Sequence, residues 1–128
     1  MKKKRVLVDM SASIIHHGHI RLLKKAKKYG KVIVALTTDN QIKKYKGFIP
    51  ELKFLQRKEI LKELRCVDKI IPSKWLISQS FLDKNKIDII ISGSDYTKRK
   101  FKTKSINFPR TRGISSSIIR KKFLNNNL

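Results

Sequence analysis

Three histidines fall within four consecutive residues, and the chain has no others. His16, His17 and His19 surround Gly18 and follow an apolar run, at a point where a helix is expected to begin. The first turn of a helix presents free backbone N–H groups and partial positive charge to an anion. Gly18 leaves room for a phosphate, and His16 and His19 face the same side of that turn. The block therefore predicts a phosphate site in which two imidazoles stabilise developing negative charge.

Two other interpretations of this block stay open. A helix can begin with histidines and bind nothing. The imidazoles can also hold a metal ion, but zinc needs three or four ligands, and Cys66 is the only thiol in the chain. A single cysteine also excludes an intramolecular disulfide framework.

A second group of anion-binding side chains lies near the end of the chain. Arg110, Thr111 and Arg112 precede Gly113, and a run of three serines begins at Ser115. A serine at a helix start is commonly an N-cap, which accounts for one hydroxyl without any ligand. Two guanidiniums beside a glycine turn are typical of a phosphate cradle instead. Two anion-binding helix starts fit a triphosphate better than a monophosphate.

Strands and helices alternate along the chain that must position these groups. Apolar runs predict strands at residues 6–8, 32–36, 67–71, 87–91 and 106–108, the third of which is expected to stop at Pro72. Helical spacing predicts helices at 17–29, 52–64, 75–84 and 115–123, with a loop and short helix at 37–45 and a basic surface loop at 98–104. This alternation predicts one α/β domain over residues 1–128, a Rossmann-like parallel sheet with helices on both faces. Ligands bind such sheets beyond the carboxyl ends of the strands.

The composition is strongly basic, with 32 lysines and arginines against 9 acidic residues and a formal charge of +23. Such a charge attracts nucleic acids and phosphorylated small molecules alike, although a bias toward Lys, Ile and Asn also adds lysines without a function. The chain has no RNP, zinc-finger or KH signature, so we expect only non-specific nucleic-acid binding. The apolar stretch 87–91 is too short to span a bilayer, and only the three apolar residues 6–8 follow the basic start before Asp9, too few for a signal peptide. These features predict a cytoplasmic protein that does not enter a membrane.

The two anion-binding groups together resemble known signatures. Residues 16–19 resemble the HxGH signature of the nucleotidyltransferase superfamily, and residues 110–115 resemble the RTxGIS signature of its cytidylyltransferase branch. Between them, segments at 38–39, 56–58, 65–68 and 93–95 resemble parts of that branch in the same order. HxGH alone has low specificity, but the two signatures together are specific. The similarity, with the segments between them, covers nearly the whole chain.

This resemblance implies that CMP is transferred from CTP to a small phosphate- or phosphonate-bearing acceptor, with release of pyrophosphate. It further implies Mg²⁺ bound with the triphosphate, in-line attack without a covalent intermediate, and a homodimer. The catalytic residues that it implies are His16, His19, Lys46 and Arg110. The implied nucleotide-binding residues are Met10, Ser11, Gly18, Gly93, Asp95, Arg110, Thr111, Gly113, Ile114 and Ser115. The implied substrate-binding residues are Lys46, Arg57, Arg65 and Trp75, where Arg65 alternatively belongs to a dimer-contact motif.

One position departs from the pattern of the family. Many relatives have an aspartate where this chain has Ser13. With the high positive charge, this loss supports the main alternative, a catalytically degenerate relative that binds nucleotide or RNA through its basic surface.

The acceptor is the least determined part of the prediction. Trp75 after Pro72 resembles the glycerol-phosphate enzymes, whereas residues 10–12 before Ile15 and His16 resemble phosphonate-pathway domains. Acidic residues that would bind an ammonium group, as in 2-aminoethylphosphonate, are scarce. We therefore expect glycerol 3-phosphate or a small phosphonate, with a slight preference for a phosphonate or phospho-alcohol that needs no ammonium partner.

Overall fold

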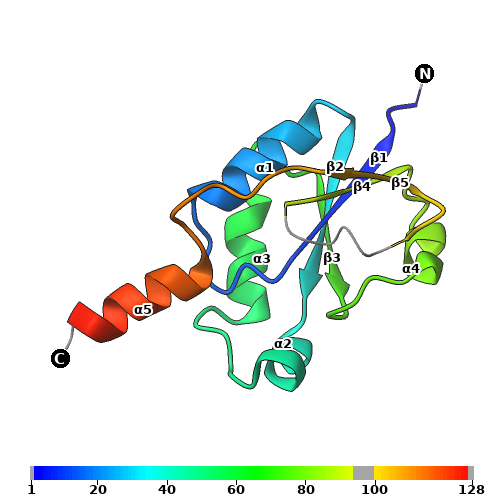
Figure 1. The fold of residues 1–128 in the computed structure, drawn as a ribbon. Coiled ribbons are helices and arrows are strands. Elements are labelled where there is room, and N and C mark those ends of the chain that lie inside the picture. The colour runs from blue at the N-terminus through cyan, green and yellow to red at the C-terminus, as the bar shows by residue number, and fades with distance from the viewer. Residues whose placement is uncertain (1, 94–99, 127–128) are drawn as a thin grey trace.

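The computed structural model describes residues 2–93 and 100–126, and Figure 1 shows their arrangement. Five strands and five helices follow one another in this part of the chain. In order they are β1 (Arg5–Met10), α1 (His17–Lys27), β2 (Lys31–Thr37), α2 (Asp39–Lys46), α3 (Phe54–Lys62), β3 (Lys69–Ser73), α4 (Gln79–Lys84), β4 (Ile89–Ser92), β5 (Lys104–Asn107) and α5 (Ser116–Asn126).

The strands form one parallel sheet in the order β3-β2-β1-β4-β5, which confirms the predicted α/β fold. From β1 the chain first winds outward to β2 and β3, and then returns to the other side of β1 to add β4 and β5. The sheet therefore reverses its winding direction between β1 and β4. A crevice at the carboxyl ends of these strands is the usual ligand site of such a sheet.

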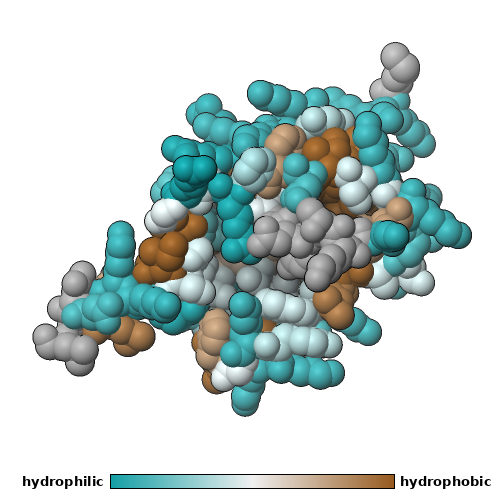
Figure 2. Space-filling view, viewed as in Figure 1, coloured by the Kyte–Doolittle hydropathy of each residue, from teal (hydrophilic) through white to brown (hydrophobic). Residues whose placement is uncertain are grey.

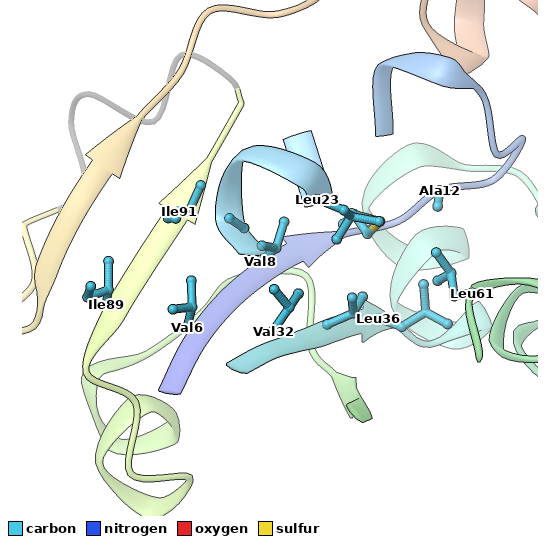
Figure 3. Packing of buried hydrophobic residues seen from close by; sticks show 12 residues of the cluster. Val6, Val8, Ala12, Leu23, Val32, Leu36, Leu61, Ile89 and Ile91 are labelled. Carbon is cyan, nitrogen blue, oxygen red and sulfur yellow. The ribbon is translucent and has the colours of Figure 1, made fainter. Parts of the chain in front are cut away.

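The core lies on both faces of the sheet. On one face, Leu23 of α1 and Leu61 of α3 pack against Val8 and Val34 of the central strands, as Figure 3 shows in part. On the other face, Leu82 of α4 packs with alternate residues of the same strands. The continuous β-branched runs of the sequence thus form strands that are buried on both sides, as expected for a parallel sheet.

Two predicted boundaries are wrong. Pro72 does not stop the third strand but lies inside β3, opposite Leu36. Because β3 is at the edge of the sheet, the missing N–H of proline does not break the ladder. Helix α4 begins at Gln79 rather than at residue 75, since the hydroxyl of Ser78 accepts a hydrogen bond from the Phe81 N–H at 3.1 Å and caps the helix there.

The remaining ends lie within three residues of those predicted. In the predicted basic loop, residues 98–99 are outside the described residues, and Lys104 is already the first residue of β5.

A glycine is required at the α1–β2 turn, because a Cβ on Gly30 would lie 2.2 Å from the carbonyl oxygen of Lys4.

The surface reflects the charge of the chain. Figure 2 shows hydrophilic residues over much of the face seen in Figure 1. None of the helices in the described part of the chain combines the length and the apolar character needed to cross a bilayer.

Candidate active site

The first turn of α1 is built from two histidines that cap each other. His16 is the N-cap, and its Nδ1 accepts a hydrogen bond from the Gly18 N–H at 3.1 Å. Nδ1 of His19 accepts in turn from the His16 N–H at 3.2 Å. A neutral imidazole that accepts at Nδ1 carries its hydrogen on Nε2. Each ring therefore has an Nε2–H to donate to a ligand.

Burial keeps both rings neutral near pH 7. The pKa of His19 is lowered from 6.5 to about 4, first by burial and then by the neighbouring His16. The pKa of His16 is lowered by burial and by His17. The ring centroids of His16 and His19 are only 3.9 Å apart, so two positive charges there would repel strongly. The pair is thus arranged as two uncharged hydrogen-bond donors.

The glycine of this turn has a local structural reason. A Cβ at Gly18 would lie 2.8 Å from Cε1 of His16, so any side chain there would displace the imidazole. The sequence suggested that this glycine leaves space for a phosphate. In the structure Gly18 also leaves space for the imidazole of His16.

A cavity of about 260 Å³ opens at the carboxyl end of β1, next to these histidines. The end of β1 and its loop, the first turns of α1, the last residue of α2, Gly93, and the segment leading into α5 all contribute to its walls. Eleven of the predicted site residues line it: Met10, Ser11, His16, Gly18, His19, Lys46, Gly93, Arg110, Thr111, Ile114 and Ser115. Gly113 is not in the lining but forms the turn before α5 with a φ of 75°. Asp95 lies outside the described residues.

Ser116 connects the start of α5 to the loop that precedes α1, beside this cavity. Its hydroxyl donates to the carbonyl oxygen of Ile14 at 2.9 Å and accepts from the Ile14 N–H at 3.2 Å. Ser115 acts as the N-cap of α5, since its Oγ accepts from the Ile118 N–H at 3.0 Å. The start of α5 is therefore held against the loop before α1, although the two are about 100 residues apart in sequence. The two helix starts are therefore close enough to bind the same polyanion together.

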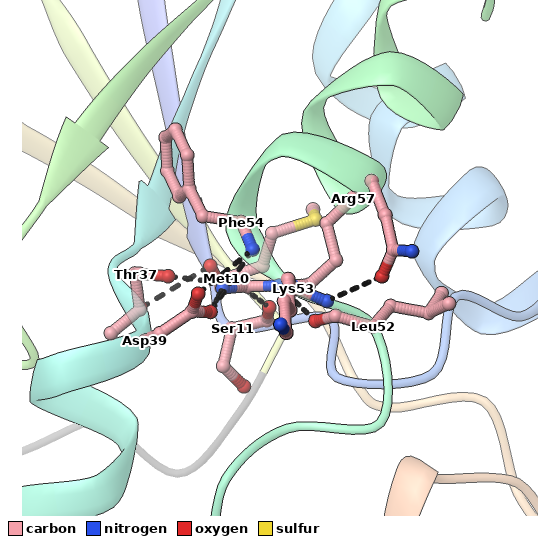
Figure 4. A network of polar contacts seen from close by, with 9 residues as sticks. Met10, Ser11, Thr37, Asp39, Leu52, Lys53, Phe54 and Arg57 are labelled. Atoms are coloured by element: carbon pink, nitrogen blue, oxygen red, sulfur yellow. Dashed lines mark hydrogen bonds and ion pairs between the residues drawn. The ribbon is translucent and has the colours of Figure 1, made fainter.

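Arg57 does not fit the predicted substrate-binding role. It is fully buried, and Figure 4 shows its guanidinium inside a network of backbone carbonyls. The guanidinium donates to the carbonyl oxygens of Leu52, Ser11 and Thr37 at 2.6–2.9 Å and to Asp39 at 2.6 Å. With these partners it ties the Ser11 loop to the end of β2 and to the segment before α3, so it supports the cavity from behind.

Arg65 also lies away from the cavity. It is exposed beyond the end of α3, close in sequence to Asp68, whose carboxylate accepts from the Val32 N–H at 2.8 Å. Val32 is near the start of β2, at the opposite end of the strands from the cavity. Within a single chain Arg65 is therefore too remote for the predicted substrate contact, and its alternative role in a dimer stays a prediction.

Among the described residues, Lys46 connects Trp75 to the cavity. The ring of Trp75 is stacked on Tyr45, with centroids 5.8 Å apart and an angle of 12° between the planes. Nζ of Lys46 lies 5.6 Å from the Trp75 ring centroid, within the range of a cation–π interaction. Trp75 is not in the cavity wall, whereas Lys46 is. The aromatic pair therefore supports the last turn of α2, which carries the lysine.

Several cavity residues were not singled out as binding residues from the sequence. Arg21 follows the cavity residue Gly18 by three positions on α1, and Lys25 follows Arg21 by four, so helical spacing could have revealed them. Arg120 follows Ser116 by four positions on α5. The others are Asp9, Ser13, Leu22, Phe48, Pro109, Ser116 and Ser117. Phe48 comes from a loop and has no such signal.

The electrostatics of the cavity favour an anion. Its described lining contains five basic residues and one acidic residue, Asp9. Within residues 2–93 and 100–126, no group of three or more His, Cys, Asp or Glu side chains is arranged around a potential metal ion. The basic side chains around the histidines therefore favour an anion such as a phosphate in this cavity.

Known proteins share this sequence pattern and this fold. Residues 11–122 match the family described as cytidylyltransferase-like. The chain is 36% identical over 126 residues to the glycerol-3-phosphate cytidylyltransferase of Staphylococcus aureus. The alignment covers 92% of this chain and 93% of that enzyme. The enzyme of the same name from Bacillus subtilis is 32% identical, and the alignment covers 92% of this chain and 95% of that enzyme. An FAD synthase of Pyrococcus horikoshii is 37% identical over 114 residues, and the alignment covers 83% of this chain and 77% of that enzyme.

A solved structure has the same fold. The lipopolysaccharide core biosynthesis protein from Thermoplasma volcanium superimposes with a TM-score of 0.73 at 26% identity, over 84% of this chain and 98% of that one. The family match covers both helix starts that meet at the cavity. The chain therefore belongs to the cytidylyltransferase-like family and is a nucleotidyltransferase.

Proposed function

We propose that the protein transfers CMP from CTP to glycerol 3-phosphate, releasing pyrophosphate and forming CDP-glycerol. The observation that carries this proposal is the pair of anion-binding helix starts that Ser116 connects beside one basic cavity. One start contributes uncharged imidazole donors, and the other contributes Arg110, Thr111 and Ser115. The first suits the reacting α-phosphate, and the second suits the β- and γ-phosphates.

The chemistry needs no covalent intermediate and no strong base. A phosphate oxygen of the acceptor attacks the α-phosphorus in line, and the bridging oxygen leaves with pyrophosphate. The attacking phosphate is largely dianionic at neutral pH, so no proton has to be removed from it. Nε2–H groups of His16 and His19 stabilise the charge that develops on the α-phosphoryl oxygens. Neutral imidazoles with lowered pKa values suit this role, which consists of positioning and electrostatic stabilisation.

Mg²⁺ is proposed to enter with the triphosphate. Mg²⁺ is commonly bound by one or two carboxylates together with substrate phosphates rather than by a protein cage. Asp9 supplies the one carboxylate in the described cavity lining, so the donor set fits that pattern. The ion would neutralise part of the triphosphate charge, while the basic side chains hold the rest.

Lys46 is proposed to bind the phosphate of the acceptor. It lines the cavity from the end of α2, where its Nζ contacts the ring of Trp75, which is itself stacked on Tyr45. The names of the Staphylococcus and Bacillus relatives favour glycerol 3-phosphate over a small phosphonate. A dianionic head is common to both acceptors, so Lys46 alone does not separate them.

The direct test is a competition assay with separated products. Purified protein is incubated with CTP, Mg²⁺ and equimolar glycerol 3-phosphate and 2-aminoethylphosphonate, and pyrophosphate and both CDP products are measured. We expect CDP-glycerol to dominate. A parallel reaction with ATP tests the choice of base, because the relatives include FAD synthases. A dominant phosphonate product would overturn glycerol 3-phosphate as the proposed acceptor. No turnover with any combination of nucleotide and acceptor would favour a catalytically degenerate binding protein.

A further inference from the structure

Lys25 is a cavity residue that belongs to neither signature. It lies near the end of α1, seven residues after Gly18, which corresponds to about 10 Å along the helix axis. Its Nζ lies 5.2 Å from the ring centroid of Phe108, which follows β5. At the start of α1, a Cβ on Gly18 would lie 3.4 Å from Cγ2 of Ile114. The segment between β5 and α5 therefore runs along α1, as Figure 1 shows, and the cavity continues between them from the histidine turn to Lys25.

The wall around Lys25 combines aliphatic side chains with one ammonium group. Leu22 lies one turn before Lys25 on α1, Pro109 follows Phe108, and both line the cavity. A Cβ on Gly93 would lie 3.0 Å from Cδ2 of Leu22, so the Leu22 side chain packs against the backbone that follows β4. Among the residues that the structure describes, Lys25 has no carboxylate partner. Its three N–H groups are therefore available to a ligand.

The proposed positions of the phosphates and of the acceptor leave this end of the cavity for the nucleoside. The α-phosphate is assigned to the histidine turn, the β- and γ-phosphates to the segment 110–115, and the acceptor to Lys46. A nucleobase has two flat faces on which other groups stack and an edge of hydrogen-bonding groups. The aliphatic wall of Leu22 and Pro109 suits a face of the base, and the ammonium of Lys25 suits an acceptor on its edge.

We propose that Lys25 is a specificity-determining residue that favours a pyrimidine base, because its ammonium donates to the O2 carbonyl oxygen of that base. The inference rests on the proposed function in the placement of the phosphates. An ammonium group donates three hydrogen bonds and accepts none. Adenine has no carbonyl oxygen, so ATP offers Lys25 a poorer acceptor. Uracil has the same O2 as cytosine, and Lys25 therefore does not separate CTP from UTP.

Binding of CTP, UTP, ATP and inorganic tripolyphosphate is measured by calorimetry at about 0.15 M salt, where long-range charge effects are screened. Lys25→Met removes the ammonium and keeps an apolar stem. Lys24→Met removes the same charge from the exposed neighbour, which is not in the cavity wall, and is the matched control. We expect Lys25→Met to weaken CTP and UTP about 10-fold and to change ATP and tripolyphosphate less than 2-fold. Lys24→Met should change all four less than 2-fold, and Lys25→Arg, which keeps a donor, should recover part of the loss.

An equal loss for tripolyphosphate and CTP in Lys25→Met would show that Lys25 binds phosphate and would overturn base selection. Equal losses for ATP and CTP would overturn the contact with a pyrimidine carbonyl. An effect no larger than that of Lys24→Met would remove Lys25 from the nucleotide site. Tighter binding of ATP than of CTP by the parent protein would contradict the proposed function instead. The role of Lys25 is judged separately, by the change in the ratio of CTP to ATP affinity on substitution.

Discussion

The back of the cavity and its rim are held together by different forces. At the back, the half-buried His16 and His19 cap each other and the fully buried Arg57 binds three backbone carbonyls, so hydrogen bonds within the chain fix these side chains. At the rim, Lys46 and Arg120 are held by aromatic rings and one ion pair on loops and helix ends. The back therefore fixes the reacting groups, whereas the rim provides charge that can adapt to a ligand. Changes at the back should cost more than changes at the rim.

The largest effect is expected for Arg57→Met. It leaves the carbonyl oxygens of Ser11, Thr37 and Leu52 without their buried donor, and Asp39 without its cation. Leaving a buried acceptor unpaired typically costs about 1–3 kcal/mol, so losing several together should cost about 3–5 kcal/mol of unfolding free energy. Urea unfolding measures it. Arg65→Met removes an exposed arginine and should change stability by less than about 0.5 kcal/mol. Similar values for the two variants would contradict the supporting role of Arg57.

His19→Ala should lower kcat about 10²- to 10³-fold, because it removes one donor aimed at the charge that develops in the transition state. It also removes the acceptor for the His16 N–H, so a stability loss of about 1 kcal/mol accompanies it. The exposed neighbour gives the matched variant, His17→Ala, which should keep kcat within a few-fold. Steady-state kinetics with CTP and glycerol 3-phosphate at fixed pH measures both. Near-parental activity of His19→Ala would remove His19 from the mechanism.

Stability should fall between pH 7 and pH 5. His19 has a folded-state pKa of about 4, below its ordinary value of 6.5, so the unfolded chain takes up a proton first as the pH decreases. The neutral ring therefore contributes stability above pH 6.5 that is lost progressively down to pH 4. For His19 alone this amounts to about 2 kcal/mol between pH 7 and pH 5, with His16 adding in the same direction.

Urea unfolding at the two pH values tests this, with His19→Gln as the comparison. That variant should show a clearly smaller pH dependence. The lowered pKa values of Glu51 and Asp68 contribute mainly below pH 5, outside the tested window. An unchanged slope in His19→Gln would mean that His19 is not the titrating group.

The smallest effect is expected for Trp75→Leu at the rim. Loss of the ring removes the cation–π contact with Lys46 and the stack on Tyr45, together worth about 1 kcal/mol. Because Lys46 is proposed to bind the acceptor, the KM for glycerol 3-phosphate should rise several-fold while the KM for CTP stays within 2-fold. Leu76→Ala changes an exposed neighbour and should alter neither. Equal increases in both KM values would assign Trp75 to general stability of the cavity instead.

Local signals made much of the site predictable. The histidine turn and the Arg110–Ser115 segment are short, and their chemistry depends on neighbouring residues, so residue type and spacing were sufficient to locate them. The strands were predictable because burial on both faces demands continuous apolar runs. The start of α4 and the end of β3 were predicted wrongly, since both depend on context. Ser78 caps only because the chain turns there, and Pro72 is tolerated only because β3 is an edge strand.

By itself, the sequence determined the parallel fold and the two anion-binding helix starts, because hydrophobic periodicity and turn chemistry act over a few residues. Only the tertiary structure decided what each arginine does. Arg57 is enclosed because α3 packs its first turn against the ends of β1 and β2, where carbonyl groups need a donor. Arg120 reaches the cavity because a carboxylate 69 residues away holds it there. The roles of both depend on contacts between distant segments, which residue type and local spacing do not encode.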